Sequence, residues 1–444
     1  MASISDAILQ RKLDLITRRL TEVDGLELVK SILAEGRSPK TFWATAPTGK
    51  PHIAYFVPIT KFADFARAGV DVTVLICDLY AFLINFKYPY ELVRLRAQWY
   101  RFMISAVLDV LGVPRSKIRF VEGSSYELSP KFTLELYKLT ALTEQADLRA
   151  IGDELHDTSK LSPLLTPGIT ALAEEYLNID FQFGGEDQRG LFRFNKQSLS
   201  QMGYRTRGFM MNPMVPGLSG PKMSSSIPDS KIEFLDPPEE VSRKIAIASC
   251  NEGDIIENGV LALLRFALIP VSELRWETRE TRHEKVAQTN DIGFPSNGFS
   301  SNGIDLNGSG FHDIHVNGHH ANDIETNGSN VKHVNAERDI NGFGILYGLP
   351  LRPFCSKDAP EGTVFTVSVG ENTGDEPSQL KHYGCYQHIE DDFAQGIIKP
   401  ANLRRAVAAA VNDLIAPLRR SFEENKEWQK VDRFGYPEEY AARK

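Results

Sequence analysis

The sequence lacks the cysteine pattern, the positive charge and the long apolar runs that would indicate several common classes of protein. Its four cysteines lie far apart and form no Cys-x-x-Cys pair, which argues against a structural zinc site and a disulfide framework. The net charge is −8, so no overall basic field attracts nucleic acid. No stretch approaches membrane-spanning length, and residues 1–12 resemble neither a secretory signal nor a transit peptide. We therefore expect a cytoplasmic protein.

What the chain does have is enough apolar sequence for two domains, since 42% of its 444 residues are hydrophobic. Short runs rich in β-branched residues predict buried strands that end near residue 45, near residue 77 and at residues 118–121. Helical spacing of apolar residues predicts a helical lead-in over residues 8–33 and a helix over residues 90–111. Alternating strands and helices predict an α/β fold with a parallel sheet covered by helices on both faces.

The second half of the chain differs in character. Between residues 289 and 344 the pair Asn-Gly recurs many times, which favours turns and leaves little apolar surface to bury. We interpret this stretch as a disordered insertion; a set of hairpins is the alternative. Residues 400–444 are predicted to be helical again. Four of their arginines, at 404, 405, 419 and 420, are interpreted as a solvated helix face.

Two short motifs carry the chemistry. Residues 47–55 contain Gly49, which permits a tight turn, and Pro51, which can begin a helix that points its N–H groups at a phosphate. His52 can donate a hydrogen bond to a phosphate oxygen, and Ala54 leaves room for a base. Residues 222–226, Lys-Met-Ser-Ser-Ser, follow a loop rich in glycine and proline that can move. Alone, each motif is weak evidence.

Together, and in this order, the two motifs resemble the signatures of class I aminoacyl-tRNA synthetases. The sequences at 43–58, 182–189 and 211–218 narrow the resemblance to eukaryotic-type tyrosyl-tRNA synthetases, over most of residues 28–237 and again from about 383 to 440. The resemblance implies a Rossmann-type catalytic domain at 1–235 and a smaller, mainly helical anticodon-binding-like domain at 236–444, usually as a homodimer. It implies no resident metal beyond the Mg²⁺ that ATP carries.

The family's functional positions can be carried over residue by residue. The resemblance implies that the catalytic groups are His52, Lys222 and Ser224. The ATP-binding residues that it implies are Thr45, Gly49, His52, Ala54, Gly185, Asp187, Lys222, Met223 and Ser225, with Asp187 on the ribose hydroxyls. The pocket for the acid substrate would be formed by Phe42, Thr166, Thr170, Ala173 and Gln188.

That acid pocket departs from the family pattern. Phe42 stands where the family has tyrosine, and residues 166–173 have lost the Tyr, Gln and Asp of the family's Tyr-Pro-Gly-x-Gln-x-x-Asp. A site that binds a hydroxyl can reject an analogue without it by about 10⁴–10⁵, and these changes remove that discrimination. We expect a wider, more apolar pocket. Residues 375–379 also have two acids and no aromatic where the family has a base-stacking residue, which made tRNA a doubtful partner.

Three hypotheses follow. The first is a tyrosyl-tRNA synthetase that activates tyrosine with ATP, releases pyrophosphate and charges tRNA. The second is an enzyme of the same fold that activates another carboxylic acid, in specialised metabolism, and does not charge tRNA(Tyr). The third is a binding or regulatory paralogue without catalysis. The intact ATP motifs favour the first two, and the altered acid pocket separates them.

Overall fold

The structure is a computed structural model that describes residues 5–85, 88–218, 228–279, 353–370 and 379–441. The Asn-Gly-rich segment and the second motif at 222–226 lie outside these residues. The predictions that concern them are therefore not tested by the fold.

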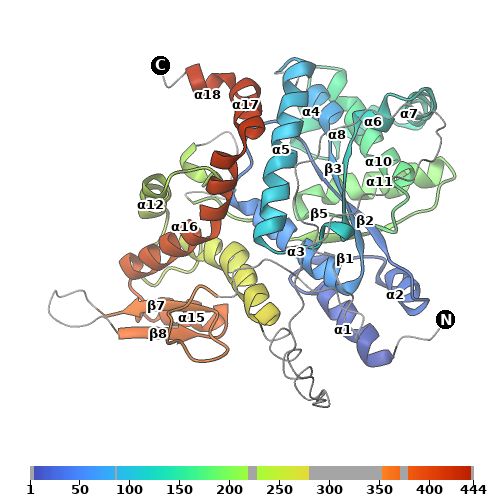
Figure 1. The fold of residues 1–444 in the computed structure, drawn as a ribbon. Helices are drawn as coiled ribbons and strands as arrows, with labels where there is room; N and C mark the ends of the chain where they lie inside the picture. Colours follow the sequence, from blue (N-terminus) through green and yellow to red (C-terminus); the bar gives the residue numbers. More distant parts are fainter. Residues whose placement is uncertain (1–4, 86–87, 219–227, 280–352, 371–378, 442–444) are drawn as a thin grey trace, which may run out of the picture.

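A six-stranded sheet forms the centre of the first half of the chain (Figure 1), in the order β1-β6-β5-β2-β3-β4. Its strands are β1 Glu22–Val23, β2 Lys40–Thr45, β3 Asp71–Ile76, β4 Ile118–Glu122, β5 Phe181–Gly185 and β6 Gly208–Asn212. All neighbouring pairs are parallel except β1 with β6. The three predicted strands correspond to β2, β3 and β4, so the parallel sheet is confirmed.

Helices cover both faces of the sheet because side chains along a strand alternate between the faces. Trp43 of β2 packs in one core cluster with residues of α3 (Phe56–Ala68) and α5 (Tyr90–Val110). Phe42, the preceding residue, packs in a separate cluster with Ala173 of α10 (Thr166–Tyr176). The helix α5 corresponds to the helix predicted at residues 90–111, so that prediction is confirmed.

The remaining elements of this half are mostly short. The helices are α1 Asp6–Thr17, α2 Leu26–Ala34, α4 Asp78–Asn85, α6 Ser124–Glu127, α7 Pro130–Leu142, α8 Gln145–Arg149, α9 Asp153–His156 and α11 Arg189–Gln201. Single helical turns lie at η1 Ile53–Tyr55, η2 Arg115–Lys117, η3 Ser162–Leu165, η4 Glu186–Gln188 and η5 Pro228–Ser230.

The predicted helical lead-in at 8–33 is wrong as one continuous helix. It is divided into α1 and α2 by the short edge strand β1. Arg19 and Gly25, on either side of β1, have left-handed backbone conformations with φ of 62° and 80°. A right-handed helix cannot pass through such residues, so the apolar spacing that suggested one helix belongs to two.

The second half of the chain is mainly helical and packs against the first. Its elements are α12 Pro238–Ile247, α13 Gly259–Leu263, the π-helical segment η6 Leu264–Leu268, helical residues 269–279, β7 Phe365–Val369, β8 Gln379–Tyr383, α15 Tyr386–Ala394, α16 Pro400–Glu424, α17 Lys426–Gly435 and α18 Pro437–Ala441. The helices α16 and α17 run beside α5 (Figure 1) and share one continuous apolar core with it.

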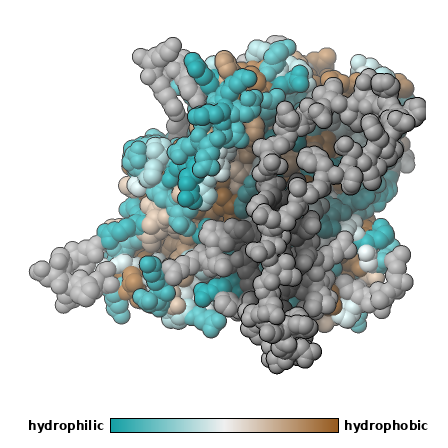
Figure 2. Space-filling model, in the orientation of Figure 1, coloured by the Kyte–Doolittle hydropathy of each residue, from teal (hydrophilic) through white to brown (hydrophobic). Residues whose placement is uncertain are grey.

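The C-terminal residues are helical as predicted, but in three segments separated at Asn425 and Tyr436. The arginines of α16 serve different purposes. Arg405 and Arg420 are exposed, whereas Arg419 donates to the Asp236 carbonyl at 2.7 Å and Arg404 donates to the Ala248 carbonyl at 3.1 Å. The surface over α16 and α17 is largely hydrophilic (Figure 2). Within the described part of the chain, no helix is long and apolar enough to cross a membrane.

Candidate active site

A cavity of about 440 Å³ opens at the carboxyl ends of the central strands. Its walls include residues 43–46 of β2 and the loop after it, residues 182–185 of β5, and residues 212–215 after β6. The chain runs from β2 to β3 on one side and returns to β5 on the other, so β2 and β5 flank the point where the strand order reverses. Open parallel sheets bind ligands in the crevice at this point.

The cavity brings together many of the residues that the sequence selected. Those that line it are Thr45, His52, Ala54, Thr170, Gly185, Asp187 and Gln188. Four others do not line it: Gly49, Phe42, Thr166 and Ala173. The second motif, with Lys222, Met223, Ser224 and Ser225, lies outside the described residues.

The first motif forms an extended loop followed by a single helical turn. His52 is extended, and its backbone forms an antiparallel bridge with Glu233, while the Ile53 N–H donates to the Ile232 carbonyl at 2.9 Å. Helical structure begins at Ile53, so Pro51 does not begin the helix as the sequence suggested. This pairing places His52 directly beside the segment that follows the second motif.

The chain on both sides of the second motif is held in place. The Leu218 N–H donates to the Ser230 carbonyl at 3.1 Å, so the two ends of the segment lie next to each other. Ile232 and Glu233, a few residues later, pair with the first motif. The first motif and the flanks of the second, which are far apart in the sequence, therefore lie at one place.

The loop of the first motif is also fastened from behind. Tyr100 of α5 donates to the Gly49 carbonyl at 2.6 Å, and Arg96 donates to the Thr48 carbonyl. Lys50 is only 8% exposed and pairs with Asp432 at 2.9 Å and Glu439 at 2.6 Å. α5 and the C-terminal helices α17 and α18 together fix this loop.

The charges around Lys50 are arranged to keep it protonated. Burial opposes the charge of Lys50, but Asp432 and Glu439 outweigh this effect and raise the pKa of the ammonium group. Burial also raises the pKa of Glu439, which makes Asp432, itself only 4% exposed, the firmer counter-charge. Asp432 accepts a second hydrogen bond from Trp99 Nε1 at 2.7 Å.

The wall of the cavity near Asp187 contains a close approach to a glycine. A Cβ atom at Gly185 would lie 2.4 Å from Asp187 Oδ1 and 3.5 Å from Met214 Sδ. A larger residue at this position would therefore force the Asp187 carboxylate to move away from the backbone. Thr45 Oγ1 and the Tyr55 hydroxyl lie 2.9 Å apart on the facing wall. The arrangement can hold a ribose between a carboxylate and an open stretch of backbone.

The acid side offers fewer free polar groups. The Thr170 hydroxyl donates to the Thr166 carbonyl at 2.9 Å, and the Thr166 hydroxyl donates to the Pro163 carbonyl at 2.8 Å. Phe42 and Ala173, 0% and 1% exposed, belong to an apolar cluster behind the wall. Both hydroxyls thus donate to backbone carbonyls, and the side chains behind them are apolar.

Sequence reasoning missed several residues of the cavity wall. Cys77, Tyr80 and Ile84 line it from the end of β3 and from α4, and burial raises the pKa of the Cys77 thiol well above its usual value. The position of Cys77 directly after a predicted strand was the signal that could have identified it, because the carboxyl ends of parallel strands meet at one edge.

A buried polar chain beside the acid side was also missed. Gln182 lines the cavity and accepts from Asn195 Nδ2 at 3.0 Å, and the same nitrogen donates to Glu174 at 3.1 Å. Burial raises the pKa of Glu174 to about 7. These residues have no motif spacing, so only their position in the fold connects them.

Comparison with known proteins agrees with this geometry. The family described as tRNA synthetases class I (W and Y) matches residues 34–290. The chain therefore belongs to this family. Within it, the relatives are tyrosine–tRNA ligases: the cytoplasmic ligase of Saccharomyces cerevisiae is 34% identical over 428 residues, which cover 95% of this chain and 87% of that protein. The resemblance inferred from the two motifs is confirmed.

Other relatives match only part of their length. The cytoplasmic tyrosine–tRNA ligase of Gallus gallus is 48% identical over 265 residues, or 59% of this chain and 50% of that protein. The chain thus spans about half the length of this relative. A crystal structure of tyrosyl-tRNA synthetase from Archaeoglobus fulgidus, complexed with L-tyrosine, superposes with a TM-score of 0.64 at 23% identity, over 93% of this chain and 99% of that one. This likeness confirms the predicted fold class.

Proposed function

We propose that the protein is an ATP-dependent ligase that activates tyrosine as its adenylate and transfers it to tRNA. The observation that carries the proposal is the pairing of His52 and Ile53 with Ile232 and Glu233 at the mouth of the cavity. This pairing brings the flanks of both motifs to one side of a crevice at the switch point of the sheet. Two separate phosphate-handling segments are what in-line displacement at a phosphate requires.

In the proposed reaction, a carboxylate oxygen of the acid attacks the α-phosphorus of ATP and pyrophosphate leaves. Negative charge grows on the departing phosphates, so positioned donors lower the barrier. His52 and Lys222 would supply these donors, and Ser224 and Ser225 would add hydroxyls. Met223 lies between Lys222 and Ser224 in the sequence. Asp187 would accept from the ribose hydroxyls over the open backbone at Gly185. Mg²⁺, carried by ATP, would neutralise charge on the phosphates.

The loop of the first motif would keep its shape during the reaction. Gly49 is held through its carbonyl by Tyr100, and Ala54 lines the cavity with Thr45. Because the loop is already ordered, no binding energy is needed to order it when a ligand binds. The backbone next to His52 would then face the same phosphate position in each turnover.

We infer that tRNA receives the activated acid. The doubt drawn from residues 375–379 is not supported, since the yeast relative named a tRNA ligase matches 95% of this chain, including the region after the insertion. Most of those residues lie outside the described structure, so the doubt about tRNA rested on their composition alone. The mainly helical region from about residue 236 is the part that we assign to tRNA contact.

A second candidate, favoured by the acid side of the cavity, is activation of a different acid. The hydroxyls of Thr166 and Thr170 are both used by backbone carbonyls, and Phe42 and Ala173 are packed among apolar side chains. Phe42 and Ala173 have no polar group for a phenol hydroxyl, and the hydroxyls of Thr166 and Thr170, whose protons are already donated, could act only as acceptors. An acid with an apolar end would suit this wall as well as tyrosine does.

Acid-dependent exchange of pyrophosphate into ATP separates the candidates. We expect exchange with tyrosine, followed by charging of tRNA(Tyr), with both lost in His52→Ala. Exchange with another acid but not with tyrosine would replace the first candidate by the second. A protein that exchanges with no acid in a broad panel of amino and non-amino acids, while still binding ATP, would refute both and leave a binding paralogue.

We also propose a cytoplasmic homodimer. Leu134 and Tyr137 share a face of α7 and are 55% and 62% exposed, and the exposed Leu142, Leu128 and Leu161 extend the apolar surface. The variant Leu134→Glu with Tyr137→Glu should convert dimers to monomers in light scattering. Ile256→Glu, at a 73% exposed site elsewhere, is the matched control. A monomeric wild-type protein would rule the dimer out.

A further inference from the structure

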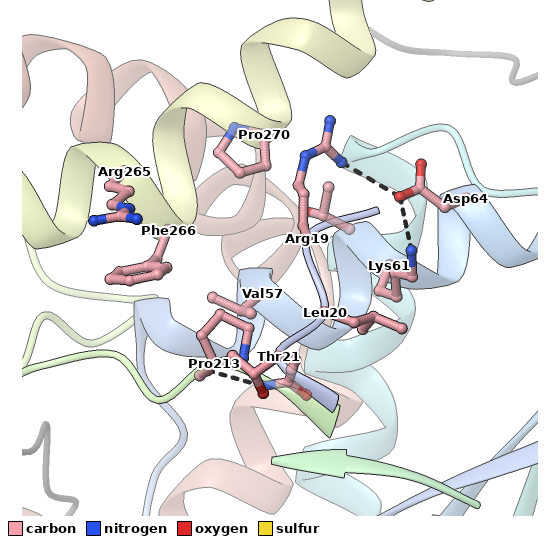
Figure 3. Close-up of a pocket in the computed structure, with 12 residues that line it drawn as sticks. Arg19, Leu20, Thr21, Val57, Lys61, Asp64, Pro213, Arg265, Phe266 and Pro270 are labelled. Atoms are coloured by element: carbon pink, nitrogen blue, oxygen red, sulfur yellow. Dashed lines mark hydrogen bonds and ion pairs between the residues drawn. The ribbon is translucent and has the colours of Figure 1, made fainter. Parts of the chain in front are cut away.

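A second cavity, also of about 440 Å³, adjoins the first, and Figure 3 shows the residues that line it. It is enclosed by the turn between α1 and β1, by α3, by the end of β6 and by the π-helical segment η6. Val57, Asn212 and Pro213 line both cavities, so they form a common wall. The volume falls in the range of small-molecule sites, about 300–1,000 Å³. Nothing in the proposed reaction uses this space.

Two buried polar atoms in this cavity have no partner within the described part of the chain. They are Thr60 Oγ1 and Asn212 Oδ1, on residues that are 2% and 8% exposed. Asn212 uses its Nδ2 on the Pro213 carbonyl at 3.0 Å, which leaves the carbonyl oxygen as an acceptor. A buried polar atom without a hydrogen bond is unfavourable, so these two atoms favour an occupant with an O–H or N–H group.

The charges on one side of the cavity are already balanced. Lys61 Nζ donates to the Leu15 carbonyl at 2.7 Å, to the Arg18 carbonyl at 2.8 Å and to Asp64 at 3.4 Å. Asp64 also pairs with Arg19, whose other partner is Glu273 at 2.6 Å. Figure 3 shows Lys61 and Arg19 both directed at Asp64. This side therefore has no cation left for a ligand.

The opposite side has a cation without a carboxylate. Arg265 is exposed and forms no ion pair within the described residues; its guanidinium lies 5.3 Å from the rings of Phe266 and Tyr386. Phe266 projects from the same helical segment on the side away from Lys61 and Asp64 (Figure 3). Segments of π-helix occur frequently at functional sites because the extra residue redirects side chains.

We propose that this cavity is a second small-molecule site, distinct from the substrate cavity, for a planar aromatic carboxylic acid with a hydroxyl or N–H group. The ring packs on Phe266 and the aliphatic wall of Leu20 and Val57. The hydroxyl or N–H donates to Asn212 Oδ1 and reaches Thr60, and the carboxylate pairs with Arg265. The apolar centre and the two polar ends are the usual composition of a specific ligand pocket.

The test uses 4-hydroxyphenylacetate as the probe, with phenylacetate and 4-hydroxyphenylacetamide as analogues that lack the hydroxyl and the charge. We expect saturable binding of the probe by titration calorimetry, and binding at least about tenfold weaker for each analogue. Thr60→Val and Arg265→Gln should each weaken probe binding by about tenfold. Thr60→Ser, which keeps the hydroxyl, should bind like the wild type.

Two matched controls show whether weaker probe binding results from changes in the proposed second site. Thr278→Val removes a buried hydroxyl elsewhere, and Arg420→Gln removes an exposed arginine of α16; both should leave probe binding unchanged. A crystal soaked with the probe should contain it between Thr60 and Arg265. No saturable binding by the wild-type protein, equal binding by Thr60→Val and Arg265→Gln, or a soaked crystal with only water in the cavity would each overturn the proposal.

Discussion

The two ends of the first cavity differ in the groups that form them. At the end that we propose for the nucleotide, Asp187 lies against the bare backbone of Gly185, and the loop before His52 is fastened through Thr48, Gly49 and Lys50. At the end that we propose for the acid, the hydroxyls of Thr166 and Thr170 donate to backbone carbonyls, and the side chains behind them are apolar.

This difference allows the type of reaction and the choice of acid to be considered separately. The type of reaction depends on the polar, fixed end, where charge develops and must be met by groups already in place. The choice of acid depends on the other end, where a change of a few side chains alters selectivity without disturbing phosphate chemistry. The predictions below probe each end, in order of decreasing effect.

Removing the buried cation of the loop should have the largest effect. Lys50→Met leaves Asp432 and Glu439 without their common cation in a site where Lys50 is 8% exposed. Breaking a buried ion pair costs about 3–5 kcal/mol, and we expect a loss of that size in the free energy of unfolding in urea. Lys399→Met, which removes an exposed pair with Glu252, is the control and should cost less than about 1 kcal/mol. Equal losses in the two variants would show that the loop is not held from behind.

The nucleotide end is tested by His52→Ala. Loss of one donor to developing charge lowers the rate by about 10²–10³, so pyrophosphate exchange should fall by that factor. The thermal unfolding midpoint should change little, because alanine keeps the backbone bridge to Glu233, although it loses the ring contact with Tyr55. His156→Ala, at an exposed histidine of α9, is the matched control. Exchange above a tenth of the wild-type rate would remove His52 from the proposed chemistry.

The acid end is tested by adding polar groups to the hydrocarbon layer. The double variant Phe42→Tyr with Ala173→Asp gives a hydroxyl and a carboxylate that can bind each other and a phenol. We expect the preference for tyrosine over phenylalanine in pyrophosphate exchange to rise by about 10²-fold. Ala173→Ser serves as a control of similar size without a charge. A preference that stays constant would mean that this layer does not influence the acid.

The last prediction concerns Glu174, whose pKa burial raises from 4.5 to about 7. A raised carboxyl pKa means that the folded state binds the proton more tightly, so this group lowers stability as the pH rises from about 4.5 to about 7 and contributes no further change above that range. Glu174→Gln, which can still accept from Asn195, should be more stable than the wild type by about 3 kcal/mol at pH 8. At pH 5 the gain should shrink, and a gain that is independent of pH would contradict the shift.

Local sequence predicted the centre of the fold well. The strands β2, β3 and β4 and the helix α5 follow from apolar runs and helical spacing, because their neighbours in the sheet do not change that local preference. The division between α1 and α2 was missed because it depends on two residues with positive φ, Arg19 and Gly25, and not on hydrophobic spacing. The β7–β8 pair was missed because β8, Gln-Leu-Lys-His-Tyr, is largely exposed and carries no apolar run that would mark it as a strand.

The candidate site was predictable where its residues form contiguous motifs. His52 and Asp187 were selected from the sequence and line one cavity. The support behind them was not predictable, because the pairs of Lys50 with Asp432 and Glu439 join distant parts of the chain. The same holds for Asn195, which joins Gln182 to Glu174 without any fixed spacing in the sequence.

The pair between Lys50 and Glu439 joins residues 389 positions apart in the chain. During synthesis the N-terminal region leaves the ribosome first, and its sheet can begin to form early. The loop before His52 acquires its counter-charges only when the α17 and α18 segments have been made. The first motif therefore reaches its final arrangement only after residues as far along the chain as Glu439 have been made, later than the sheet that carries it.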